Sequence, residues 1–308
     1  MNKSLTRSEY LMSFLFIFML ICVVAAFFFG YDVGSDRTKV RYEAKLAQNN
    51  EQPQELTAYH QQYLVSFYHS VYAPYDEFRK QWFNFRESLE TGGAAAGNPA
   101  KSLQELSKSA NQIYEKMMTF SVPPSSPALQ EAQNLYLKSL KLFEQASGER
   151  QSKSNGLQPS ALLAALDSDS YIQQAIQYGL DAQSQYFEAI LKWNESVQPV
   201  PGQELLSSSN LPISDWGKLN LNAKNKYVSA MMSENKWFLP VQTMDLVARM
   251  DEMIASGQAQ KLGLTETKPL AELIVQTGAV REGDFAKTKE KFYAQQTLPQ
   301  LPFFFGSN

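Results

Sequence analysis

The sequence predicts an all-α protein: an N-terminal single transmembrane helix, then an up-down four-helix bundle, then a smaller helical C-terminal region. Three observations support this. The segment Tyr10–Phe29 is apolar and contains no charged residue. In several long segments after it, apolar side chains recur every three or four residues, which is the period of one helix face. No segment alternates polar and apolar residues over a length that would predict a β-strand.

The segment Tyr10–Phe29 has the length that a helix needs to cross a bilayer, about 20 apolar residues. Two other interpretations stay open. The segment could be a cleaved signal peptide, although the apolar core of such peptides is usually about 7–15 residues long. Alternatively, Cys22 could be acylated, although bulky Ile21 precedes it. We expect an uncleaved anchor at residues 10–29, between a short tail (1–9) and a juxtamembrane stalk (30–53).

The charges that flank the span bear on its orientation. More basic residues follow the span than precede it, with Lys3 and Arg7 before it and Arg37, Lys39, Arg41 and Lys45 after it. This bias favours a cytoplasmic body, but long following domains translocate largely regardless of charge. A single N-terminal span before a large body is typical of a signal anchor. We therefore expect a single-pass protein of the cell membrane with its body on the extracytoplasmic side.

The composition argues against several function classes. The chain has 308 residues with 28 Lys and Arg against 31 Asp and Glu, a net charge of −3, which gives no reason to expect nucleic acid as a partner. Cys22 is the only cysteine, so the body can form neither a disulfide nor a thiolate metal site. The absence of cysteine from the body fits the surface of a Gram-positive-like bacterium or a cytosol better than an animal secretory route. The only histidines, His60 and His69, fall on opposite sides of a predicted helix. We expect no metal and no cofactor.

The four-helix bundle is predicted over residues 54–198, and its first helix runs from Gln54 to about Glu90. The apolar stripe of this helix is Tyr59, Tyr63, Phe67, Val71, Tyr75, Phe78, Trp82, Phe85 and Leu89. Pro74 predicts a kink, because proline removes one backbone hydrogen bond and clashes with the preceding turn. Arg79 is expected on the polar face of the helix.

Three further helices complete the predicted bundle. The second follows an Asn98 cap and carries a seam from Leu103 to Phe120. The third opens at Ser126-Pro127, and the fourth extends from about Ser160 to Val197. The fourth helix has a face of small side chains at Ala175, Gly179 and Ala182. We expect this face to pack against the aromatic residues of the first helix, because large against small fills space.

The C-terminal region, residues 199–297, is predicted to contain shorter helices, with starts near Ser214, Pro240, Pro269 and Glu282. Residues 298–308 form an apolar tail that is not expected to be helical near its prolines. Its phenylalanines are expected to dock onto the body. The alternative is that they touch a partner or the bilayer surface.

The sequence contains no nucleophile elbow, phosphate loop or zinc-protease helix. The carboxylates of Asp245, Asp251 and Asp284 are expected on a solvated surface. Asp245 is expected to pair with Arg249, four residues further along the same helix. Asp284 is expected to cap the last helix. Enzymatic activity is therefore not expected.

The function expected is that of a membrane-anchored, non-catalytic extracytoplasmic protein. It would act as an interaction or scaffold component of a bacterial envelope complex, with the bilayer and a membrane protein as partners. The alternative is an extracytoplasmic ligand-binding or sensor module with an aromatic-lined pocket, and an enzyme of unrecognised type comes third. A buried polar group inside an aromatic-lined cavity would favour the sensor. The candidate interaction or pocket surface consists of Tyr68, Tyr72, Trp82, Phe83, Phe303, Phe304 and Phe305.

Overall fold

The computed structural model describes residues 58–154 and 156–305, and within these ranges the fold is all-α with no strand. Pro212 and Glu266 form an isolated antiparallel bridge. The expected span Tyr10–Phe29 and the expected stalk lie outside the described residues. Among the helices of the described part, none combines the length and the apolar character that crossing a membrane requires.

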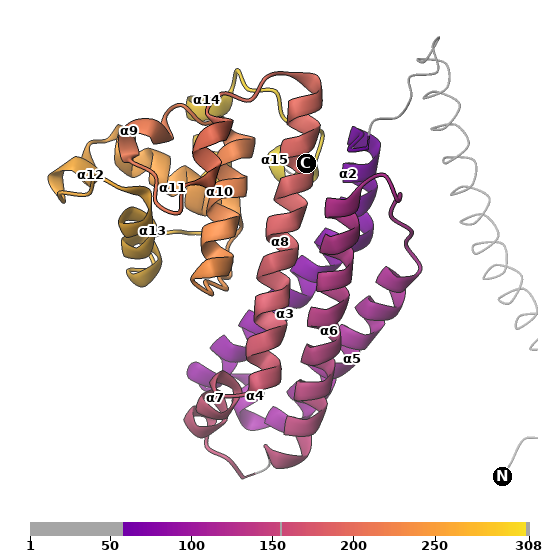
Figure 1. Ribbon diagram of the computed structural model, residues 1–308. Coiled ribbons are helices and arrows are strands. Elements are labelled where there is room, and N and C mark those ends of the chain that lie inside the picture. The colour runs from indigo at the N-terminus through magenta and orange to yellow at the C-terminus, as the bar shows by residue number, and fades with distance from the viewer. Residues whose placement is uncertain (1–57, 155, 306–308) are drawn as a thin grey trace, which may run out of the picture. The chain divides into compact units, whose positions relative to one another are not determined.

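Four long helical segments lie side by side and alternate in direction along the chain, which confirms the predicted helical bundle (Figure 1). They are the continuous run of α2 (Gln61–Phe67), η1 (Tyr68–Tyr72) and α3 (Ala73–Glu90), followed by α5 (Pro99–Met118), α6 (Pro127–Lys153) and α8 (Ser170–Val197). Short helices occupy two of the turns, α4 (Ala94–Gly97) and α7 (Pro159–Asp167). The fourth predicted helix, from about Ser160 to Val197, is divided into α7 and α8 at residues 168–169.

The first helix passes Pro74 through a π-helical turn, η1, that directly precedes α3. Proline cannot donate the backbone hydrogen bond of an α-helix, and its ring clashes with the carbonyl one turn earlier. In η1 each backbone hydrogen bond reaches five residues back instead of four, and the N–H of Ala73 donates to the carbonyl of Tyr68. The apolar stripe stays in phase, and Tyr68 and Tyr72 stack with ring centroids 5.8 Å apart.

The core of the bundle contains most of the predicted stripe. All stripe residues from Phe67 to Leu89 are buried, whereas Tyr59 and Tyr63 are half-buried. Trp82 is 1 % exposed and packs against Phe143 on α6, with ring centroids 5.1 Å apart. This stripe therefore fills the space between the helices.

Gly179, in the small-residue face of α8, lies against Tyr75 of the first helix and Ser139 of α6. A Cβ atom placed on Gly179 would lie 2.0 Å from the hydroxyl oxygen of Tyr75. That hydroxyl is hydrogen-bonded to Ser139 Oγ at 2.8 Å, so it is held on α6 and has little room to move. Glycine at position 179 therefore allows the close contact with Tyr75.

Gly179→Ala is expected to lower the free energy of unfolding by about 1–3 kcal/mol, because the added methyl group overpacks the contact with Tyr75. Chemical denaturation of residues 57–308 would measure this. Gly148→Ala in α6 is the matched control, since its Cβ would meet only Ser107 Oγ at 3.4 Å. Alanine is the better helix former, so this control should raise the stability by up to about 1 kcal/mol. Equal effects of the two substitutions would contradict the close packing at Gly179.

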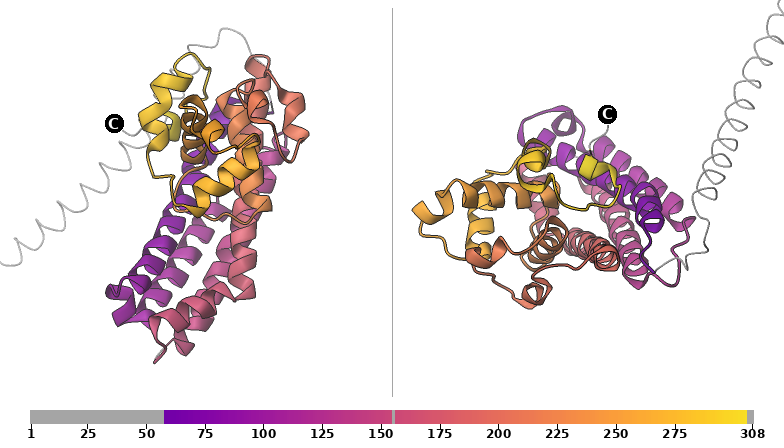
Figure 2. Two further views of the ribbon diagram at one scale, coloured as in Figure 1. Left: turned by 90° about the vertical axis from the view of Figure 1, so that its left-hand side faces the viewer. Right: turned by 90° about the horizontal axis from the view of Figure 1, so that it is seen from above.

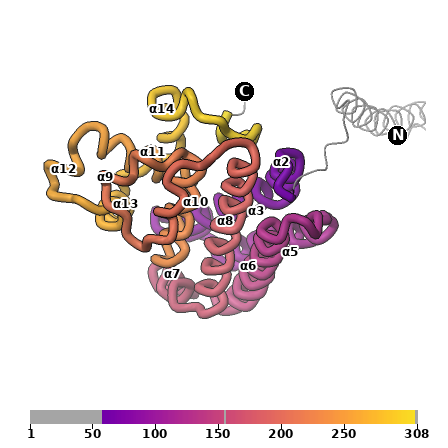
Figure 3. The backbone as a smooth tube through the Cα atoms, turned by 45° about the horizontal axis from the view of Figure 1, so that its top comes forward, coloured from indigo at the N-terminus to yellow at the C-terminus, as the bar shows by residue number. Residues whose placement is uncertain are grey.

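The C-terminal helices gather beside one half of the long helices, with α10 against α8 (Figures 2 and 3). They are η2 (Gln203–Ser207), α9 (Ile213–Trp216), α10 (Leu221–Glu234), α11 (Thr243–Ala255), α12 (Gln258–Lys261), α13 (Thr267–Gln276), α14 (Asp284–Tyr293) and α15 (Pro302–Phe305). Residues Thr57–Asn308 form one compact unit.

Two expected helix boundaries in this region are wrong. The helix expected to start near Ser214 is divided into α9 and α10, because Asn220 caps a new start by accepting the N–H of Ala223 at 2.9 Å. The helix expected from Pro240 begins at Thr243, where Gln242 and Asp245 form a capping box. Local hydrogen bonds of polar side chains therefore set these starts.

Candidate functional site

A second buried stripe on the first helix faces the C-terminal helices. Its members recur every three or four residues, as the main stripe does, and are Tyr68, Tyr72, Tyr75, Arg79 and Phe83. Tyr72, Tyr75 and Arg79 are buried, and Tyr68 and Phe83 are half-buried against the core. The side chains that lie off the main stripe therefore widen the buried face of this helix.

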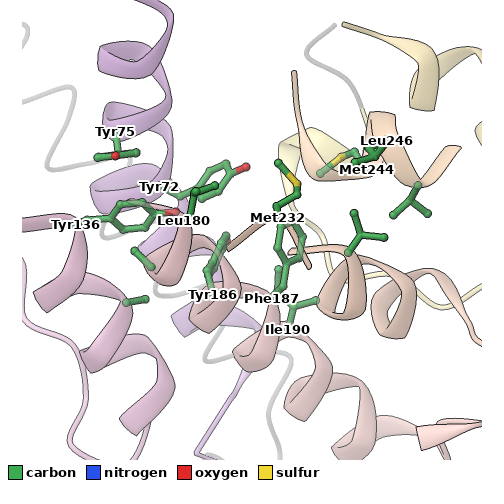
Figure 4. Close-up of a cluster of buried hydrophobic side chains, with 14 of the residues drawn as sticks. Tyr72, Tyr75, Tyr136, Leu180, Tyr186, Phe187, Ile190, Met232, Met244 and Leu246 are labelled. Carbon is green, nitrogen blue, oxygen red and sulfur yellow. The ribbon is translucent and has the colours of Figure 1, made fainter. Parts of the chain in front are cut away.

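This stripe borders a small cavity between the bundle and the loop from Asn235 to Gln242, which we call the 235–242 loop. The cavity has a volume of about 10 Å³. In Figure 4, Tyr72, Tyr136, Leu180 and Met232 converge on this region from separate helices. The residues that line the cavity also include Tyr75, Asp76, Arg79, Gly179, Gln183, Phe238 and Leu239. Such a volume accommodates about one water molecule, whereas ligand pockets are typically about 300–1,000 Å³.

Arg79 ties the 235–242 loop to the first helix. Arg79 is 4 % exposed, and its guanidinium pairs with Asp76 through Nη2 and Oδ1 at 2.5 Å. Nη1 donates to the carbonyl oxygens of Leu239 at 3.2 Å and Val241 at 3.0 Å. The expectation that Arg79 lies on a polar face is wrong, because the loop covers this side of the helix.

Arg79→Ala is expected to lower the free energy of unfolding by about 2–3 kcal/mol, because hydrogen bonds to a charged group are lost and two loop carbonyls are left unpaired. Urea denaturation would show this as a lower midpoint. Arg86→Ala is the control on the same helix, since Arg86 forms a surface pair with Asp167, whose side chain is 59 % exposed. That variant should cost no more than about 1 kcal/mol. Similar midpoints for the two variants would contradict the role of Arg79 as a buried tie.

The tyrosine hydroxyls around the cavity differ in their partners. The hydroxyl of Tyr72 donates to Gln242 Oε1 at 2.5 Å. The hydroxyl of Tyr75 bonds Ser139, whose Oγ donates in turn to the carbonyl of Ala175 at 2.6 Å. No hydrogen bond to another described side chain or backbone group is present at the hydroxyl of Tyr136, which is 1 % exposed. Burial raises the pKa of all three tyrosines above the ordinary value.

The protein is expected to unfold cooperatively as the pH rises above about 10. Burial also raises the pKa of Tyr186 and Tyr293, so these five hydroxyls stay protonated in the folded state after those of the unfolded chain begin to ionise near pH 10. Stability is therefore unaffected by them below that pH and falls above it. Tyrosine ionisation followed by ultraviolet absorbance should show a late group that ionises together with the loss of helical circular dichroism. Ionisation of every tyrosine with the helices intact would contradict the burial of these side chains.

A second buried polar cluster is centred on Asp251 in the C-terminal region. Its Oδ1 accepts from Lys224 Nζ at 2.7 Å and from Trp216 Nε1 at 2.6 Å, and its Oδ2 accepts from the hydroxyl of Tyr293. Lys224 Nζ also lies 5.0 Å from the ring centroid of Trp216. The four residues come from α10, α9, α14 and α11, so Asp251 joins four helices. The expectation of a solvated Asp251 is wrong.

The other two carboxylates considered from the sequence also differ from expectation. Asp245 is buried and accepts the N–H of Gln242 at 3.1 Å and the N–H of Phe285 at 3.0 Å, so it supports the starts of both α11 and α14. Burial raises its pKa. Arg249 pairs with Glu252 at 2.6 Å instead of with Asp245. Asp284 is the first residue of α14, after a Gly283 cap, and accepts the N–H of Arg281 at 2.8 Å.

Among the candidate surface residues, the structure brings Tyr68, Tyr72 and Phe303 together. The ring centroid of Phe303 lies 5.5 Å from that of Tyr68 and 5.6 Å from that of Tyr72. Phe304 is 1 % exposed and packs against Phe285 with centroids 6.0 Å apart. Two phenylalanines of the tail thus dock onto the body. The expectation of a non-helical tail is wrong for Pro302–Phe305, because Pro302 occupies the first position of α15, where no N–H is needed.

The remaining candidate residues lie apart from this group. Phe305 is 46 % exposed, with Lys289 Nζ 4.3 Å from its ring centroid. Trp82 belongs to the bundle core, and Phe83 packs against Phe238 with centroids 5.2 Å apart. Sequence reasoning missed Arg79, Tyr136 and Gln183 as cavity residues. The helical period could have placed Arg79 on the buried face, because it follows Tyr72 by seven residues and Tyr75 by four.

No group of three or more histidine, cysteine or acidic side chains that could hold a metal ion occurs within the described ranges. Nδ1 of His60 accepts the N–H of Gln62 at 3.3 Å and so caps α2. Comparison of the chain with family models, with curated proteins and with solved structures finds no match in any of the three.

Proposed function

We propose that the protein is a membrane-tethered, non-catalytic helical protein that acts by contact with another protein in a bacterial envelope complex. The body would lie on the extracytoplasmic side. The observation that carries this proposal is the uncharged segment Tyr10–Phe29 ahead of a large helical body.

The arrangement of the body supports an interaction role over catalysis. The Arg79–Asp76 pair and the Lys224–Asp251 pair are each neutralised within the chain, and the cavity beside Arg79 and Asp76, of about 10 Å³, is too small for a substrate. The carboxylate of Asp251 accepts three side-chain donors, which leaves it little capacity to act as a general base. Both clusters therefore contribute to holding helices together.

Site-specific photo-crosslinking in intact cells would test the interaction. A photoreactive amino acid would replace Met118, Phe305 or Leu262, which are 55 %, 46 % and 58 % exposed and lie on different elements. The proposal predicts a crosslink to a membrane-associated protein from the position that faces the partner and none from the positions on other faces. If no position gives a crosslinked product beyond the background of an irradiated wild-type control, the interaction role is wrong.

A ligand-binding or sensor module is the second candidate, and one observation favours it. The buried Arg79–Asp76 pair lies beside a cavity lined by three tyrosines. This is the kind of polar group in an aromatic surrounding that a sensor would use. Its volume of about 10 Å³ leaves no room for such a ligand unless a wall of the cavity moves.

A further inference from the structure

The residues that line the cavity beside Arg79 differ in how deeply they are buried. Tyr72, Tyr75, Tyr136 and Leu180 are all buried and belong to helices of the bundle. The opposite wall is the 235–242 loop, which contributes Phe238 and Leu239. Trp237, Phe238 and Leu239 are only half-buried, and they lie between α10 and α11, outside both helices. Moving the loop therefore exposes less apolar surface than moving any helix around the cavity.

The N-terminal half of the loop is fixed to α10. Lys236 has a φ of 56°, and it is the one non-glycine residue with positive φ in the part of the chain that the structure describes. This left-handed residue belongs to the C-cap of α10, because the N–H of Lys236 donates to the carbonyl of Ser233 at 3.2 Å and the N–H of Trp237 donates to the carbonyl of Met232 at 2.8 Å. Any opening of the loop therefore involves the residues after Trp237.

The C-terminal half of the loop is held against the first helix by two side chains. Arg79 Nη1 holds the carbonyls of Leu239 and Val241, and the hydroxyl of Tyr72 holds Gln242 at the end of the loop. Lys80, next to Arg79, pairs with Glu282 at 3.1 Å, outside the loop. Release of the bonds made by Arg79 would free residues 238–241, which lie between the C-cap of α10 and the capping box of Gln242 and Asp245 at the start of α11.

The residues that the loop covers include polar groups as well as apolar ones. The hydroxyl of Tyr136 borders the cavity without a protein partner among the described residues. The amide of Gln183 also lines it and donates to Thr243 Oγ1 at 2.7 Å. The cavity of about 10 Å³ has room for one water molecule beside this hydroxyl.

We propose that the 235–242 loop is a gate over this cavity, and that Arg79 is the latch that holds it closed. In the closed state the space admits about one water molecule. In the open state both hydrogens of Arg79 Nη1 are released from the loop, and the hydroxyls of Tyr72 and Tyr136 become accessible together with the aromatic faces around them. The gate is a property of the body and does not depend on the membrane tether.

Thiol labelling tests the gate without any knowledge of a ligand. Because Cys22 is the only native cysteine, a Cys22→Ala full-length protein in detergent provides a thiol-free background. Leu180→Cys places a reporter in the cavity, and Gln183→Cys provides a second one. Ala146→Cys is the control, because Ala146 is 1 % exposed in the core of the bundle and does not line the cavity. A small methanethiosulfonate reagent would be used, and labelling would be followed over time.

The gate predicts that Leu180→Cys reacts at least about tenfold faster than Ala146→Cys, because local opening is more frequent than unfolding of the bundle. It also predicts that Arg79→Gln raises the labelling rate of Leu180→Cys by about tenfold more than that of Ala146→Cys. Equal labelling rates for the cavity and core cysteines would overturn the proposal. So would labelling of both cavity cysteines as fast as an exposed cysteine at Leu262, since the cavity would then have no closed gate. An equal effect of Arg79→Gln on all sites would remove Arg79 as the latch.

Discussion

Asp251→Leu is expected to lower the free energy of unfolding of the body by about 3–5 kcal/mol. Removal of this carboxylate leaves the ammonium of Lys224 buried without a counter-charge and deprives Trp216 and Tyr293 of their acceptor. Breaking a buried pair by removing one partner is costly because the remaining charge stays desolvated. Urea unfolding of residues 57–308, followed by circular dichroism, would measure the loss.

A double variant separates the cost of the stranded charge from the cost of lost packing. Lys224→Met in the Asp251→Leu background removes the unpaired ammonium, and replacement of a buried pair by apolar residues is often close to neutral. The double variant should therefore be more stable than Asp251→Leu alone by at least about 1 kcal/mol. If Lys224→Met destabilises Asp251→Leu further, the ion pair is not the main contribution of this cluster.

Trp82→Ala is also expected to cost about 3–5 kcal/mol, because it opens a cavity in the centre of the bundle. Trp82 is 1 % exposed and packs against Phe143 on α6 and Phe85 on its own helix. Leu262→Ala, at a side chain that is 58 % exposed, is the control and should change the stability by no more than about 0.5 kcal/mol. A Trp82→Ala protein that unfolds at the wild-type midpoint would move the ligand-binding alternative ahead of the interaction role.

The bundle was predictable because its helices carry their signals locally. The three- and four-residue spacing from Phe67 to Leu89 places those side chains on one face whatever packs against it. The small side chains around Gly179 predicted a close neighbour, and the structure places Tyr75 there. The caps at Asn98 and at the Asp167–Ser170 junction involve neighbouring residues only.

The polar clusters were not predictable in the same way, because their partners are distant in sequence. Arg79 bonds a loop 160 residues further along the chain, which no periodicity in the first helix can reveal. Asp251 follows Met244 and Val247 at seven and four residues, so its phase indicates the buried face of α11. Because Asp251 is charged, the sequence suggested an exposed side chain instead. The buried carboxylate is accommodated by Lys224, Trp216 and Tyr293, which only the structure brings next to it.

Protease digestion of intact cells that express the full chain, after removal of the cell wall, tests the proposed membrane tether most directly. The chain should remain with carbonate-washed membranes through Tyr10–Phe29, and protease added outside should degrade the body while a cytoplasmic marker stays intact. Protection of the body until the cells are lysed would contradict the extracytoplasmic location. Recovery of the full chain in the carbonate wash would contradict the tether itself.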